Sequence, residues 1–305
     1  MNTCAALIII YNHKYINNIE ILEKMYCERF STIYHLMPFY DGDKSNVISV
    51  YGNSHYFQGY IAQGLAQYLQ ENISHYFFIA DDLILNPAIN ESNYTEQFKL
   101  KKDTSFLPGF INLHDVVNWW SRIGEAYRYC PQKKGAETEK ELPSYNEALG
   151  YFERFNLTLK PLNFNRIWQL WKSLDFSSFL RHDFILFFLY VLWKKQYNLR
   201  YPLVGAYSDI SVVSSSIIKR FAHYCGVFAA TDLFVELALP TALVLSARDI
   251  VTEKDLQLHG KAMWSIEDYE KILKYKNKLS LLLSDFPNDY LYLHPIKLSK
   301  WDTRI

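Results

Sequence analysis

Two adjacent carboxylates, Asp81 and Asp82, follow a run of apolar and aromatic residues in the segment HYFFIADDLILNP. Buried carboxylates are costly unless they are solvated, hydrogen-bonded or bound to a cation. Carboxylate oxygens suit Mg²⁺ or Mn²⁺, and such an ion can in turn hold a diphosphate. The pair therefore predicts a divalent-metal site with Asp82 as the main ligand and Asp81 assisting. A helix N-cap or turn is the structural alternative.

A basic segment near the end of the chain, HPIKLSKW, could supply the other half of such a site. His294 can complete the coordination of a metal ion, and Lys297 and Lys300 can neutralise the oxygens of a departing diphosphate. Taken alone, the segment is also typical of an exposed basic tail. Together, the acidic and the basic segments supply complementary parts of a metal–diphosphate site.

An acidic residue inside an apolar run is a candidate proton acceptor, because burial raises the pKa of a carboxyl group. Glu236 is the only acidic residue between Leu233 and Leu245, and Asp232 stands at the polar edge of that run. We expect Glu236 to be the catalytic carboxylate with Asp232 in reserve, and Asp209 to bind an acceptor hydroxyl. The alternatives are a structural Glu236 paired with an arginine, a capping Asp232 and a turn residue at Asp209.

The elements expected around these residues alternate between strands and helices. Apolar runs, the first of them rich in β-branched residues, predict strands at 5–10, 33–37, 47–51 and 76–79. Apolar positions at helical spacing predict helices at 18–30 and 58–70. This order is typical of an α/β sheet with ligands at the carboxyl ends of its strands. Tyr11 and Asn12 after the first strand, and Tyr51 after the third, are therefore expected to line a nucleotide pocket.

The second half of the chain is expected to be richer in helices. Residues 131–147 are polar and contain two prolines, which predicts a surface loop or mobile lid, with a domain boundary as the alternative. Beyond it we expect helices at 166–174 and 178–196, a strand at 209–213, a helix at 215–225 ended by Gly226, a helix, turn and strand around Pro240, a long helix at 266–284 and a strand-like, then basic, tail.

The most apolar stretch, FILFFLYVLW at 184–193, is too short to span a bilayer, which needs roughly 20 residues. We expect it to form a buried core helix, and contact with a membrane surface is the alternative. The N-terminal residues lack the basic region and cleavage site of a signal peptide.

The overall composition narrows the class of protein. Half of the 305 residues are hydrophobic, enough for one large α/β domain or two small ones. Lys and Arg balance Asp and Glu at 32 each, whereas a nucleic-acid-binding protein usually has a basic excess. The four cysteines are far apart, so reduced thiols are expected rather than a zinc site or disulfides. The sequence contains no GxSxG, GxxxxGK[ST], GxGxxG or HExxH motif.

In the segments IIIYNH, FFIADDLILNP and HPIKLSKW the chain resembles glycosyltransferases of the GT-A type, which use nucleotide sugars. Their D-x-D-like motif binds a divalent metal and the donor diphosphate; here Ala80 replaces its first Asp, which leaves the ribose contact of that Asp in question. The tail is similar, with different spacing, to the H-x-G-x-x-K-P-W ending of one retaining branch. The segment GVFAATDLFVELALPTAL looks like parts of the galactofuranosyl-adding domain of bacterial O-antigen and capsule galactan polymerases.

The resemblance implies one domain over residues 1–305, with a GT-A-like mixed sheet flanked by helices and with helical insertions. Residues 1–130 would bind the nucleotide sugar, and 148–305 would bind the acceptor and carry the diphosphate clamp. The implied reaction is transfer of a hexose, galactofuranose or galactose, from a UDP-sugar to a glycan acceptor, free or lipid-linked. It would use Mn²⁺ or Mg²⁺ and serve bacterial surface polysaccharide synthesis in the cytoplasm, at or near the inner face of the membrane. A sugar nucleotidyltransferase and a non-catalytic glycan-binding or scaffold protein are the open alternatives.

Overall fold

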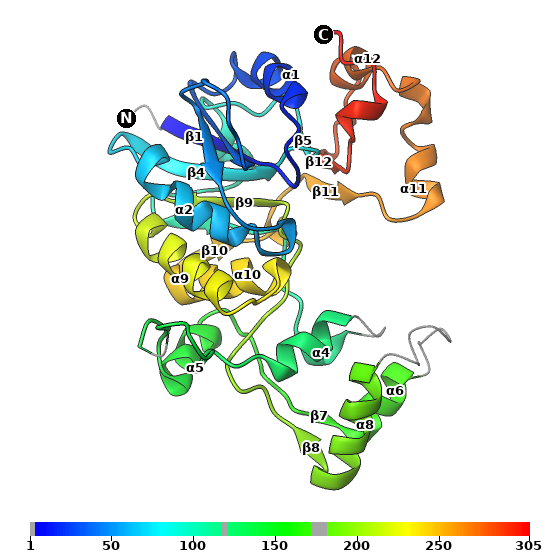
Figure 1. Ribbon diagram of the computed structural model, residues 1–305. Helices are drawn as coiled ribbons and strands as arrows, with labels where there is room; N and C mark the ends of the chain where they lie inside the picture. The colour runs from blue at the N-terminus through cyan, green and yellow to red at the C-terminus, as the bar shows by residue number, and fades with distance from the viewer. Residues whose placement is uncertain (1–3, 117–120, 139, 172–181) are drawn as a thin grey trace.

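The computed structural model describes residues 4–116, 121–138, 140–171 and 182–305. Its centre is a seven-stranded sheet in the order β10-β6-β9-β4-β1-β2-β3 (Figure 1). These strands are β1 Cys4–Ile10, β2 Thr32–Pro38, β3 Val47–Val50, β4 Ile73–Ala80, β6 Thr104–Phe106, β9 Ile210–Ser214 and β10 Asp249–Val251. β9 runs antiparallel to both of its neighbours, and all other neighbouring pairs are parallel. The expected mixed α/β sheet flanked by helices is confirmed.

Helices and two small sheets surround this central sheet. The helices are α1 Asn17–Tyr26, α2 Gln58–Tyr68, α3 Tyr94–Gln97, α4 Ser121–Arg128, α5 Tyr145–Glu153, α6 Phe164–Trp171, α8 His182–Lys194, α9 Ile218–Ala230, α10 Val235–Ser246, α11 Ile266–Glu270 and α12 Leu279–Ser284. One small sheet has the order β11-β12-β5, with bounds His259–Ala262, Tyr290–His294 and Ile84–Leu85. The other pairs β7 Leu162–Asn163 with β8 Gln196–Tyr197. The four predicted N-terminal strands, the two helices among them, the strand at 209–213 and the strand in the tail are thus confirmed.

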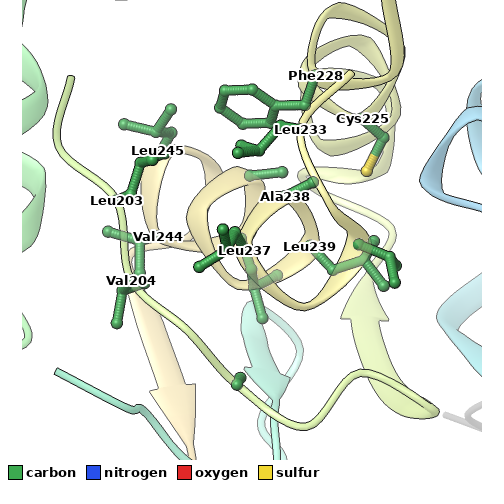
Figure 2. Packing of buried hydrophobic residues seen from close by; sticks show 14 of the residues in the cluster. Leu203, Val204, Cys225, Phe228, Leu233, Leu237, Ala238, Leu239, Val244 and Leu245 are labelled. Atoms are coloured by element: carbon green, nitrogen blue, oxygen red, sulfur yellow. The ribbon is translucent and has the colours of Figure 1, made fainter. Parts of the chain in front are cut away.

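The central sheet is buried on both faces. Along β1, Ala6 and Ile8 belong to one hydrophobic cluster, whereas Leu7 and Ile9 belong to the cluster on the opposite face. Figure 2 shows the first cluster where α9 and α10 pack together. A strand covered on both faces needs apolar side chains at every position, which explains the unbroken apolar run that predicted β1.

The expectation of a break at Pro240 is wrong, because α10 continues from Val235 to Ser246 with Pro240 inside it. A proline in a helix lacks the N–H that would bond to the carbonyl four residues earlier, here that of Glu236. The carbonyl of Glu236 accepts a hydrogen bond from the N–H of Ala206 instead, at 2.9 Å. The chain before β9 thus satisfies the group that the proline leaves free.

Gly226 does not end a helix, since α9 continues to Ala230. A Cβ atom at Gly226 would lie 3.3 Å from the Cβ of Ala62 in α2. Glycine here therefore permits close packing of α9 against α2.

The long helix expected at 266–284 is also wrong. The segment forms α11, a 3₁₀ turn at Leu273–Tyr275 and α12. Lys276 and Asn277 have left-handed backbone angles, with φ of 50° and 53°, and such residues interrupt an α-helix.

The loop at 131–147 is confirmed for the described residues as far as Ser144, which caps α5. The helices expected at 166–174 and 178–196 correspond to α6 and α8, while 172–174 and 178–181 lie outside the described residues. The prediction of a buried core helix at 184–193 is wrong for one side of α8, on which Leu189 and Trp193 are exposed. Hydrophobicity alone predicted burial, but among the described residues this side of α8 is exposed.

Candidate active site

Strand pairing brings Asp81 and Asp209 to the same edge of the central sheet. Asp81 directly follows β4, and its N–H donates to the carbonyl of Ile10 at the end of β1, at 2.9 Å. Because β9 is antiparallel to β4, the residue before β9 lies at the carboxyl end of β4. The N–H of Ala80 accordingly donates to the carbonyl of Asp209 at 2.9 Å.

The small sheet brings His294 to Asp82. β5 follows Asp82 closely and pairs antiparallel with β12, so that Ile84 lies opposite Leu293. This register places the next residue of β12, His294, beside the chain that leads into β5. The N–H of Ile296 then donates to the carbonyl of Asp82 at 2.7 Å and ties the tail to the acidic pair.

Asp82, Asp209 and His294 form a close cluster of side chains. Nε2 of His294 lies 3.1 Å from Oδ1 of Asp82 and 3.9 Å from Oδ1 of Asp209. The closer pair lies within ion-pair distance but lacks the alignment of a hydrogen bond. Among the described residues, neither Asp82 Oδ1 nor His294 Nδ1 has a hydrogen-bond partner, and both atoms are buried.

The electrostatics of this cluster favour the protonated forms of His294 and Asp209. Burial by itself lowers the pKa of His294, but the two neighbouring carboxylates outweigh it and the pKa is raised. Burial raises the pKa of Asp209; His294 opposes this shift, and the charge of Asp82 adds to it. The His294 ring and the Asp209 carboxyl group thus both hold protons more tightly than they would in water.

Asp81 is buried and held from one side by Asn18, whose amide donates to Oδ2 at 3.0 Å. Burial and, second, the charge of Asp82 raise the pKa of Asp81 to about 7. Asp82 is the one of the two whose carboxylate lies at ion-pair distance from His294, and its role as the main metal ligand stays a prediction.

Two cavities open at this edge of the sheet and share Asn12 and His13 in their walls. The first, of about 190 Å³, also touches Asp81, Asp82 and Lys297. The second, of about 240 Å³, is lined further by His55, Ser208, Asp209, Phe234 and Glu236. The acidic pair and the candidate base therefore face neighbouring spaces.

Glu236 lies in the first turn of α10, at the wall of the second cavity. Burial raises the pKa of Glu236 to about 7, the charge of Asp209 adds to the shift and Arg122 opposes it. Arg122 forms its ion pair with Glu125, at 2.8 Å, and its guanidinium group covers the ring of Phe234. Glu236 can thus exchange a proton near neutral pH.

Lys300 and Asp232, two other predicted site residues, do not line the two cavities that share Asn12. Lys300 lines a neighbouring cavity of about 250 Å³ that Lys297 also touches. Asp232 is exposed, forms an ion pair with Lys133 and does not line the two cavities that share Asn12. Asp232 therefore lies at the surface, three residues before α10 begins at Val235.

Tyr11 and Tyr51 do not line the two cavities either. The ring of Tyr11 is completely buried and its hydroxyl lies 2.9 Å from Nδ1 of His35. Tyr51 is exposed, and its ring contacts Phe39. Of the three residues expected in the nucleotide pocket, Asn12 lines both cavities, whereas Tyr11 is buried and Tyr51 is exposed outside them.

Sequence reasoning missed His13, Asn18 and Tyr207. His13 could have been found, since it directly follows Asn12 at the end of the first predicted strand. Asn18 carries no motif signal, and only the packing of α1 brings it to Asp81. Tyr207 stacks on Tyr292 with ring centroids 5.8 Å apart and lies edge-on to His294.

In the described part of the chain, protein side chains do not form a complete metal site by themselves. Within the described ranges, no three or more His, Cys, Asp or Glu side chains are grouped so that they alone could hold a metal ion. The nitrogen of His294 that faces Asp82 is Nε2, 3.1 Å from Oδ1 of Asp82, so one ion held by both residues would bind these two atoms and not the unpartnered Nδ1. Mg²⁺ is commonly bound by one or two carboxylates, with waters and substrate phosphates completing its coordination.

No protein-family model matches the chain, and no curated protein matches it either. Among solved structures, the chain is similar to the mannosyltransferase Ktr4p from S. cerevisiae, with 10% sequence identity, 84% of this chain and 70% of that chain covered, and a TM-score of 0.33. A likeness at this level is too distant to assign an activity. In the described parts of the chain, no helix is long and apolar enough to cross a membrane.

Proposed function

We propose that this protein is a glycosyltransferase that uses a nucleotide-diphosphate sugar and a divalent cation. The observation that carries the proposal is that Asp82 and Asp209, which both lie near Nε2 of His294, line two adjoining cavities. One cavity has an acidic pair and a lysine, which suits a metal-bound diphosphate, and the other has a carboxyl group that titrates near neutral pH.

Asp82 and His294 would hold the cation, and Lys297, which also lines the first cavity, would contact the diphosphate. When bound, a divalent cation neutralises the oxygens of the diphosphate and makes it a better leaving group. Lys297 adds a second positive charge for the same oxygens. Asn12 and His13, which border both cavities, would lie beside the sugar as it passes from donor to acceptor.

Glu236 would accept the proton of the acceptor hydroxyl. In an inverting transfer, the acceptor oxygen forms a bond to the anomeric carbon while the bond from that carbon to the diphosphate breaks, and the hydroxyl proton moves to Glu236. A neutral alcohol is a weak nucleophile, so a base at this position accelerates the step. Asp209, which lines the same cavity, would orient the acceptor through its carboxylate.

The finer assignment follows the resemblance of the sequence to GT-A enzymes. It proposes a UDP-sugar donor carrying galactofuranose or another hexose, and a surface glycan as acceptor. The Ala80 position leaves the ribose of the nucleotide without the carboxylate that this family uses.

Release of UDP from a panel of UDP-sugars, with Mn²⁺ or with EDTA, tests the activity. Calorimetry of UDP binding tests the metal site: Asp82→Asn should lower the Mn²⁺-dependent affinity at least about tenfold, because it removes the charge of one of two protein ligands. Asp43→Asn, a change at an exposed loop residue, is the matched control. Equal affinity in the two variants would rule out Asp82 as a ligand.

Two further experiments, a pyrophosphate-release assay and a thermal-shift measurement, separate this proposal from its alternatives. A nucleotidyltransferase would release pyrophosphate from a nucleoside triphosphate and a sugar 1-phosphate, and a glycosyltransferase would not. A glycan-binding scaffold would show no change in melting temperature with UDP and Mn²⁺.

A further inference from the structure

Helix α8 presents an exposed apolar face at the end of the molecule away from α1 (Figure 1). Leu189, Leu192 and Trp193 are 55%, 53% and 74% exposed. Together with Ile185, these residues recur at a spacing of three or four along the helix, which places them on one side of it. On the other side, Val191 is buried in the hydrophobic cluster that covers the central sheet. The exposed side is thus a second apolar face and not part of the core.

The surroundings of this face are positively charged. Residues 154–208 contain eight Lys and Arg residues against two acidic residues, Asp175 and Asp183, although the whole chain has a formal net charge of zero. Lys194 and Lys195 follow the apolar residues directly, and both are exposed. The ammonium group of Lys194 lies 3.7 Å from the centre of the Trp193 ring. The basic charge of this region is therefore concentrated next to exposed apolar side chains.

We propose that α8 docks on an anionic lipid membrane and lies flat in its interface. Helices of this kind bury an apolar face with Leu and Trp at the boundary between headgroups and acyl chains, and their Lys and Arg residues contact anionic headgroups. Leu189, Leu192 and Trp193 would enter the boundary region, and Lys194 and Lys195 would lie at the lipid phosphates. With 13 residues, α8 is too short to span a bilayer and long enough to lie on one.

The charge distribution argues for lipid rather than for a second copy of this chain. Two copies joined through this face would bring two basic regions together, and like charges at close range repel. An anionic membrane satisfies both the apolar face and the positive charge.

Sedimentation of the whole chain with vesicles tests the proposal and requires no sugar transfer, so its outcome is independent of the proposed activity. The protein should bind vesicles of phosphatidylcholine mixed with phosphatidylglycerol, and bind pure phosphatidylcholine at least about tenfold more weakly. Leu189→Glu should reduce partition into the mixed vesicles at least about tenfold, and the double change Lys194→Glu with Lys195→Glu should abolish the preference for anionic lipid.

Leu281→Glu is the matched control, because Leu281 is 42% exposed on α12, away from the basic region. It should bind as the unaltered chain does. If circular dichroism shows no cooperative unfolding of Leu189→Glu, that variant is not folded, and Leu192→Ser takes its place in the test.

Two results would overturn the proposal. One is equal vesicle binding, or equal lack of binding, by the unaltered chain and the α8 variants. The other is a lipid-free dimer, seen by sedimentation velocity, that Leu189→Glu converts to a monomer without any change in vesicle binding; the face would then be an interface between copies.

Discussion

Three carboxyl groups near the site hold their protons to unusually high pH, but their partners differ. Asp81 accepts a hydrogen bond from Asn18 in a buried position, which is typical of a positioning residue. Asp209 faces the ring of His294. Asp209 and Glu236 border the same cavity, so a hydroxyl group of an acceptor could reach either, but Asp209 is shared with His294. Of the three, Glu236 is therefore the best placed to transfer a proton.

We predict that Glu236→Gln lowers kcat at least about a hundredfold and leaves the affinity for the donor unchanged, because the change removes the base and keeps the shape. In the unaltered protein, kcat should rise with pH through about 7, since only the ionised carboxylate can accept a proton and the pKa of Glu236 is raised to about 7. Steady-state rates across the pH range measure both effects.

Glu153→Gln, an exposed change on α5, is the control and should leave the rate and its pH profile unaltered. A stable Glu236→Gln protein with normal turnover would exclude Glu236 as the base and turn attention to Asp209.

At the scale of elements, the tail divides into two parts. β12 lies between β11 and β5 in the small sheet and most of it is buried, so 290–294 is ordered by backbone pairing. Beyond it, Lys297, Ser299 and Lys300 are exposed. A closing motion on the donor would therefore involve the second part only.

We predict that UDP with Mn²⁺ slows amide hydrogen exchange at 296–301 and leaves exchange at 290–294 slow in both states. Segments that close over a ligand become ordered with it, while paired strands are protected throughout. Mass spectrometry of the two peptides measures this. Equal exchange at 296–301 with and without ligand would contradict a clamp formed by Lys297.

The contact between α9 and α2 gives a prediction about stability. Gly226→Leu should lower the free energy of unfolding by about 1 to 3 kcal/mol, because the added side chain has no room beside Ala62. Gly150→Leu on α5 should instead be neutral or stabilising by about 0.5 to 1 kcal/mol, since a Cβ there meets no atom within 4 Å and glycine is a poor helix former. Urea denaturation compares the two, and equal effects would disprove the tight contact.

At the scale of the whole molecule, the site should weaken the fold as pH rises. Burial raises the pKa of Asp81 and Glu236 to about 7. Between the unfolded values near 4 and this value, the folded protein binds more protons than the unfolded chain, so stability falls as pH increases. His294, whose pKa is raised by its carboxylate neighbours, acts in the same direction.

We predict that Glu236→Gln and Asp81→Asn melt above the unaltered protein at pH 8 and close to it at pH 5. For chains of about 150 to 250 residues, each kcal/mol added to the free energy of unfolding raises the melting temperature by about 2 to 4 °C. Thermal unfolding at the two pH values measures the difference. Melting temperatures that differ from the unaltered protein by the same amount at both pH values would show that burial does not strain these carboxyl groups.

The sequence by itself determined the elements whose pattern is local. Unbroken apolar runs predicted β1 to β4 because a strand buried on both faces needs apolar side chains throughout. The acidic pair at the end of β4 and the histidine of the tail were visible for a related reason: polar groups after a buried strand stand out from their neighbours. Their roles as metal ligands stay predictions.

Only the tertiary structure decided which of these residues meet. Pairing of β5 with β12 brings His294 to Asp82, and the antiparallel direction of β9 brings Asp209 to the same edge. Neither pairing has a signature in the sequence, because each joins segments more than one hundred residues apart. For the same reason the helix through Pro240 escaped prediction, because a distant N–H satisfies the carbonyl of Glu236. The hydrophobicity of α8 likewise did not reveal that one of its sides is exposed among the described residues.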